Sequence, residues 1–219
     1  MSCAPGVVWG GGVSNHVDSP TGVSISITSP TGTLGWIGRE NNPTGQDTAL
    51  DVTGTCADKP AGYKIVKEAV NAPVGTQRTA TATCPAPTVL LSGGADSATS
   101  SPLSQITSAA PTSSTTFTGY ISNGSSAAVK LQVFAICAKQ PRGWVMETKT
   151  FPATPGQSRT SLDCPANTAV LGGGVALAKH TPSVYIVTTS PLGSAGWVSG
   201  VTNETTHNVK STVYAICGR

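Results

Sequence analysis

The chain has 219 residues and a net charge of +3, with only 11% charged residues and its thirteen Lys and Arg dispersed. A nucleic-acid-binding surface needs clustered basic residues, and a membrane-spanning helix needs about eighteen consecutive apolar residues. Neither pattern is present, so we expect no nucleic-acid partner and no membrane span. Thr, Ser, Gly, Val and Pro dominate, which predicts an all-β fold because they favour strands and turns over helices.

The first part of the chain, up to Cys56, is expected to form four short strands. Residues 7–13, "VVWGGGV", form an apolar strand whose glycines indicate a bulge, a bend or a close backbone approach. Residues 23–27 alternate apolar and polar side chains, which predicts a half-buried strand. "GWIGREN" at 35–41 and "ALDVTGTC" at 49–56 complete the set.

The segment Ala57–Thr83 follows this core, and its "YKIVKEAV" and "RTATATC" predict a further strand pair. The pattern then repeats. A second core ends in "KLQVFAIC" and is followed by the connecting segment Ala138–Asp163, and a third core ends in "STVYAIC". We therefore predict one domain over 1–219 with internal repeats 1–83, 84–163 and 164–219.

Six cysteines mark these units at equal spacing. Members of each pair are 53 positions apart: Cys3 and Cys56, Cys84 and Cys137, Cys164 and Cys217. Three equal separations favour one disulfide within each unit, and each bridge contributes about 4 kcal/mol on the chain-entropy model. Zinc sites need close pairs such as C-x2-C, which are absent, so we predict no metal and no cofactor.

The cysteines also favour an oxidising compartment. Met1 is followed directly by Ser-Cys-Ala-Pro-Gly, without a signal peptide. We expect a secreted protein whose signal peptide has been removed.

Two connecting segments serve three cores, and only Gly218 and Arg219 follow the last one here. If three sheets close around a threefold axis, one face then lacks a strand pair. We expect this open face near Cys3 and Cys217 to accept a strand from a partner or from a removed N-terminal extension.

Candidate binding residues recur at fixed positions in the units. Aromatic rings stack on sugars, and an Asn amide both donates and accepts hydrogen bonds. Equally, a repeated aromatic can fill the core of each unit, a repeated Asn can fix a turn, and an aromatic in a connecting segment can anchor an interface. The candidates are Trp36 and Trp197 (with Phe117 between them), Asn42, Asn123 and Asn203, and Tyr63 and Trp144 of the connecting segments.

Catalytic motifs are missing. The three histidines, His16, His180 and His207, occupy unrelated positions in the units, and His16 has a carboxylate, Asp18, two residues away. There is no nucleophile elbow, P-loop or zinc-protease motif. We therefore predict no catalytic residues and a protein that is not an enzyme; the alternative is a hydrolase that depends on His16 or Asp18.

The pattern "CPANTAVLGGG…GW…N…VYAIC" resembles the vitelline membrane outer layer proteins, whose units also open with a "CP" turn and close on an apolar strand bearing Cys. This resemblance implies a pseudo-threefold β-prism of three Greek-key-like repeats that binds ligands, often carbohydrate. A β-trefoil is the alternative fold, although its units are usually near forty residues.

The glycine-rich strand end and the "V-[YF]-A-I-C" close are also similar to small secreted Cys-repeat proteins of actinobacteria. Some of these are non-enzymatic adaptors in secreted toxin particles. The expected function is a lectin-like or adaptor module that recognises a cell-surface glycan or a partner protein. The alternative is a subunit of a larger secreted, toxin-like assembly that accepts a partner strand.

Overall fold

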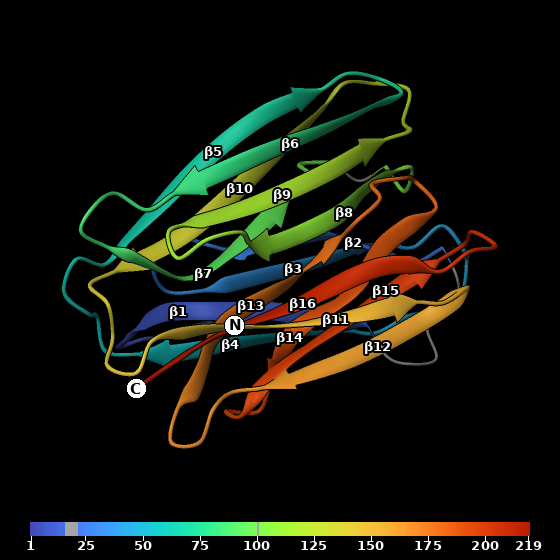
Figure 1. The fold of residues 1–219 in the computed structure, drawn as a ribbon. Helices are drawn as coiled ribbons and strands as arrows, with labels where there is room; N and C mark the ends of the chain where they lie inside the picture. Colours follow the sequence, from blue (N-terminus) through green and yellow to red (C-terminus); the bar gives the residue numbers. More distant parts are fainter. Residues whose placement is uncertain (16–21, 100) are drawn as a thin grey trace.

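Three antiparallel sheets make up the protein (Figure 1). The computed structural model describes residues 1–15, 22–99 and 101–219, which form sixteen strands and no helix. The predicted all-β fold is therefore confirmed, and the arrangement of three sheets is compatible with a β-prism.

Each sheet takes strands from more than one unit. The first sheet has the order β12 (Gly156–Asp163), β15 (Gly196–Asn203), β14 (Val184–Leu192), β1 (Val7–Asn15), β4 (Leu50–Ala57). The second has the order β3 (Trp36–Asn41), β2 (Ser24–Pro30), β7 (Val89–Asp96), β10 (Val129–Ala138), β5 (Lys64–Ala72). The third has the order β11 (Val145–Ala153), β16 (Val209–Gly218), β13 (Ala169–Leu177), β8 (Ser104–Pro111), β9 (Thr116–Asn123), β6 (Thr76–Thr83).

Every unit is divided between two sheets. Its first and fourth strands pair in one sheet, as β1 and β4 do, and its second and third strands pair in another, as β2 and β3 do. The second strand also pairs with the first strand of the next unit: β2 with β7, β8 with β13, and β14 with β1. Since the last of these joins the third unit to the first, the arrangement closes into a ring with pseudo-threefold symmetry.

The consecutive glycines of β1 allow close approach to two different neighbours. A Cβ added at Gly11 would lie 2.5 Å from Cδ2 of Trp36, and one added at Gly12 would lie 2.6 Å from Cα of Ser190 in β14. Real Cβ atoms do not tolerate such distances, so glycine is required where β1 meets the aromatic ring and the third unit.

The prediction of half-buried second strands is wrong. All residues of β2 are buried, including the polar Ser24, Ser26 and Thr28. The second strands lie inside their sheets, and β2, β8 and β14 contact one another across the centre of the molecule. The small hydroxyl side chains therefore face other strands rather than water.

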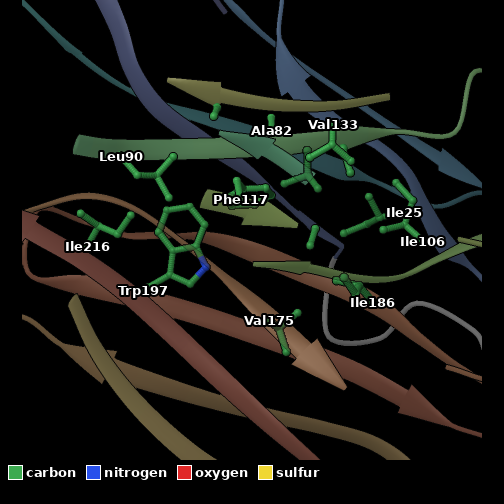
Figure 2. Close-up of a cluster of buried hydrophobic side chains, with 14 of the residues drawn as sticks. Ile25, Ala82, Leu90, Ile106, Phe117, Val133, Val175, Ile186, Trp197 and Ile216 are labelled. Atoms are coloured by element: carbon green, nitrogen blue, oxygen red, sulfur yellow. The ribbon is translucent and has the colours of Figure 1, made fainter. Parts of the chain in front are cut away.

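All three units contribute to one buried hydrophobic cluster. Figure 2 shows Leu90, Phe117 and Trp197 close together, although they belong to β7, β9 and β15. The predicted disulfide pairing is confirmed: the bonds join Cys3 to Cys56, Cys84 to Cys137, and Cys164 to Cys217.

Candidate functional site: an open pair of sheet edges

The outer strands β3 and β4 lack neighbours that their counterparts have. In the second unit β10 pairs with β5 and β9 pairs with β6, while in the third unit β16 pairs with β11 and β15 pairs with β12. Among the described residues, no strand continues the sheets beyond β3 or β4. Figure 1 shows the two covering pairs far apart, with β5 and β6 at the top of the view and β12 at the bottom.

The open edges lie at the first unit, so the expected position near both Cys3 and Cys217 needs correction. Cys217 pairs with Val145 of β11 and is fully buried. The reason is that each connecting segment covers the unit that follows it, not the unit that precedes it. The open edges are consequently beside Cys3 and Cys56.

The first two residues continue the pattern of β6 for a short distance. Ser2 forms an isolated bridge with Gly35, and Met1 exchanges backbone hydrogen bonds of 3.2 and 3.4 Å with Trp36. In the second unit, the last two residues of β6 pair with the same positions of β9. Beyond this short stretch, the edge of β3 from Ile37 to Asn41 has no neighbouring strand among the described residues.

Without a covering strand, the disulfide of the first unit is accessible. Cys56 is exposed, whereas Cys137 and Cys217, its counterparts under β5 and β11, are 0% exposed. A shallow depression beside Cys56 is lined by residues that include Cys3 and Asp58.

Mild reduction is expected to open Cys3–Cys56 on the order of tenfold faster than Cys84–Cys137, whose cysteines are both buried, because thiol–disulfide exchange requires access to the sulfur. Partial reduction with a phosphine, alkylation and peptide mass spectrometry measure the order of opening. Earlier loss of the Cys84–Cys137 bond would show that the first unit is covered in solution.

A polar cluster replaces apolar side chains at the open edges. Glu40 occupies the position of Ile121 in the second unit, and Thr48 that of Val129. The Thr48 hydroxyl donates to Oε1 of Glu40 and accepts a 3.1 Å hydrogen bond from Nδ2 of Asn42. The other carboxylate oxygen of Glu40 is buried and has no hydrogen-bond partner among the described residues.

Glu40 and Thr48 were not among the candidates from sequence. The available signal was their polarity at positions that are apolar in the other two units, Ile121 and Val201 for Glu40. This difference in polarity indicates a binding site only once the structure shows that the edge is open.

The side chains of Asn123 and Asn203 each bind both their own turn and a connecting segment. Nδ2 of Asn123 donates to the carbonyl of Ala72, at the end of β5, and Nδ2 of Asn203 donates to that of Ala153, at the end of β11, both at 2.8 Å. All three Asn also bond within their own turns. Asn42 has no connecting segment beside it, is exposed, and donates to Thr48 instead.

The recurrent aromatics lie in the core. Trp36 and Trp197 are 2% and 1% exposed, and their Nε1 atoms donate to Oγ1 of Thr28 at 3.2 Å and of Thr189 at 3.1 Å. Phe117, which has no ring donor, is equally buried, and its unit has an alanine at the threonine position. In this structure no ring face of these three residues is open to a ligand.

The aromatics of the connecting segments anchor those segments. Tyr63 donates from its hydroxyl to the carbonyl of Val8 at 2.6 Å, and Trp144 donates from Nε1 to that of Leu90 at 2.8 Å. Burial raises the pKa of Tyr63 to about 12. Each ring thus fixes its segment to the first strand of the preceding unit.

One Ser–His contact exists among the described residues, but it is structural. Nδ1 of His180 lies 3.3 Å from Oγ of Ser108, and the imidazole stacks on Tyr120 with ring centroids 3.8 Å apart. Burial lowers the pKa of His180. Ser108 is only 1% exposed, so its hydroxyl is not accessible to a substrate.

The remaining candidates add no chemistry to the described part of the chain. The pair His16 and Asp18 lies outside the described residues. Within those residues, no cluster of three or more His, Cys, Asp or Glu has the arrangement of a metal site. The same part of the chain contains no helix long and apolar enough to cross a membrane.

No protein-family model matches the chain, and no curated protein matches it either.

Proposed function

We propose that this protein is a secreted adaptor that binds a partner protein at the open edges of β3 and β4. The observation that carries the proposal is the comparison of the three units: strands of the chain itself cover the equivalent edges in the second and third units. Unpaired edges offer rows of N–H and C=O groups to an added strand. The three disulfides fit an oxidising compartment, and the resemblance to secreted adaptors supports the same function.

Exposed apolar side chains beside β3 support a protein partner. Met1, Leu34 and Ile37 are 43%, 46% and 41% exposed. Leu34 and Ile37 flank the start of this strand, and the Met1 backbone is hydrogen-bonded to Trp36 there. An exposed apolar group at an edge is covered when a strand is added, which strengthens the backbone pairing.

The sequence of β4 favours a separate partner that binds reversibly. Residues Thr53–Thr55 are Thr-Gly-Thr, whereas the same positions of β10, Phe134–Ile136, are Phe-Ala-Ile. A strand that is always paired at its edge keeps apolar side chains, as β10 does beside β5. Polar side chains keep an uncovered edge soluble between encounters.

A protein partner is also better supported than a glycan. Trp36 and Trp197 are buried, and Tyr63 and Trp144 are half-buried and hydrogen-bonded to backbone carbonyls. Sugar stacking needs an open aromatic face, and none of these four rings is fully exposed.

Affinity capture followed by hydrogen exchange tests the adaptor function. The immobilised protein is used to capture secreted proteins of the producing organism, and amide exchange is then measured in the purified complex. We expect new protection in β3 and β4 and none in β10 or β16, which are already covered.

Two matched variants test whether capture of the partner depends on the β3 edge. Ile37→Asp places a charge beside the β3 edge and should reduce capture at least roughly tenfold, whereas Leu192→Asp changes an equally exposed side chain on β14 and should not. A captured protein that leaves exchange in β3 and β4 unchanged would exclude the function. Self-association through these edges, measured by light scattering, would also count against it.

A further inference from the structure

We infer that the segment bound at this site is a β-hairpin of the same type as the chain's own connecting segments, with a basic side chain opposite Glu40. The inference rests on the proposed function and specifies the chemistry of the partner.

The two connecting segments define the shape of this hairpin. β5 and β11 have nine residues, and β6 and β12 have eight. Gly75 lies in the turn between β5 and β6, and Gly156 is the first residue of β12, directly after the turn from β11; their φ angles of 69° and 91° favour glycine. A hairpin that covers β4 with its first strand and β3 with its second therefore needs strands of similar length and a tight turn with glycine.

The strand register identifies the side chain that would lie opposite Glu40. In the second unit Arg78 of β6 pairs with Ile121, and Ile121 occupies the position of Glu40. Directly opposite residues of an antiparallel pair lie on the same face of the sheet, with Cβ atoms about 5 Å apart. A hairpin bound in this register thus places its Arg78 counterpart beside the Glu40 carboxylate.

The carboxylate oxygen of Glu40 that has no hydrogen-bond partner among the described residues makes that position selective for a basic side chain on the hairpin. A covering strand removes water from the carboxylate, and a buried unpaired charge is unfavourable. A Lys or Arg on the hairpin compensates for this loss, whereas an acidic or apolar side chain does not. Ile121 and Val201 impose no such requirement on the hairpins that cover their units.

Asn42 provides the second contact. Asn123 and Asn203 each donate to the last residue of the first connecting strand, at Ala72 and Ala153. In the free first unit, the corresponding amide hydrogen of Asn42 goes to Thr48. An incoming hairpin supplies the missing carbonyl, so Asn42 changes acceptor and the turn end of the hairpin is held in register.

A peptide from the chain itself is a suitable probe. The synthetic peptide of residues 64–83 contains β5, the turn and β6 with Arg78, and a second peptide carries Arg78→Glu. Calorimetry and hydrogen exchange with the intact protein should show that the first peptide binds and protects β3 and β4. The second should bind at least roughly tenfold more weakly.

Charge exchange on the protein separates pairing from a structural role of Glu40. The Glu40→Lys variant should reverse the preference and bind the Arg78→Glu peptide more tightly, and Glu40→Gln should bind both peptides about equally. Glu68→Lys, the same change on the outer strand β5, is the control and should keep the original preference. A purely structural role of Glu40 gives no such reversal.

A fusion protein tests the site when a free peptide binds too weakly to measure. Residues 57–83 replace Met1 and Ser2, so that the hairpin precedes Cys3 as it precedes Cys84 in the second unit. Lack of protection in β3 and β4 of the fusion protein would overturn the inference. Equal effects of Arg78 and Glu at this position would also overturn it, while protection by the natural partner would still uphold the adaptor function.

Discussion

Replacing Trp197 by alanine should lower the free energy of unfolding by about 3–5 kcal/mol. The indole is 1% exposed, and its Nε1 donates to Thr189. It lies against Gly173, where an added Cβ would be 2.5 Å from Cδ2 of the ring, so it packs directly on the backbone of β13. This backbone is held by β16 and cannot move into the vacated space, so a cavity remains. Chemical denaturation monitored by circular dichroism measures the loss.

Trp9→Ala is the matched control, because it removes the same side chain from a partly exposed position. The Trp9 indole bonds to the backbone carbonyl of Asp58 at the surface. We expect this substitution to cost no more than about 2 kcal/mol. Equal losses at the two positions would show that Trp197 does not fill a rigid core.

Removing the central disulfide by the double substitution Cys84→Ala and Cys137→Ala should lower the free energy of unfolding by about 4 kcal/mol. The bond closes a loop with a sequence separation of 53, and its cysteines are 4% and 0% exposed. Both cysteines are replaced so that no free thiol remains. Denaturant unfolding under non-reducing conditions measures the change.

The corresponding change in the first unit, Cys3→Ala with Cys56→Ala, tests how much of the loss in unfolding free energy arises from changes in the folded state. Its loop has the same separation of 53, so the entropic effect on the unfolded chain is the same. Because Cys56 is exposed, its replacement leaves less of a cavity, and the loss should be smaller than in the second unit. A larger loss in the first unit would contradict an uncovered edge.

The open edge could be anticipated from sequence only in part. Residues 1–219 hold two connecting segments for three cores, and the spacing does not say which core each segment covers. The structure shows that β5 and β6 cover β10 and β9, the unit that follows them, and this leaves β4 and β3 open. Glu40 becomes notable only then, because an isolated carboxylate in an edge strand is ordinary until its counterparts are seen to be buried under a neighbouring strand.

The amino-acid sequence by itself determined the β-rich fold, the three units and the pairing of the six cysteines. These follow from local composition and from equal spacing along the chain, which are properties of single units. Only the tertiary structure decided the roles of Trp36, Trp197 and the Asn positions, and the complete burial of Ser24–Pro30. The physical reason is that each unit divides its strands between two sheets. Trp36 and Trp197 are therefore buried where strands of their own unit pack on each other, whereas Ser24–Pro30 contact strands of the other units, and spacing along the chain specifies neither contact.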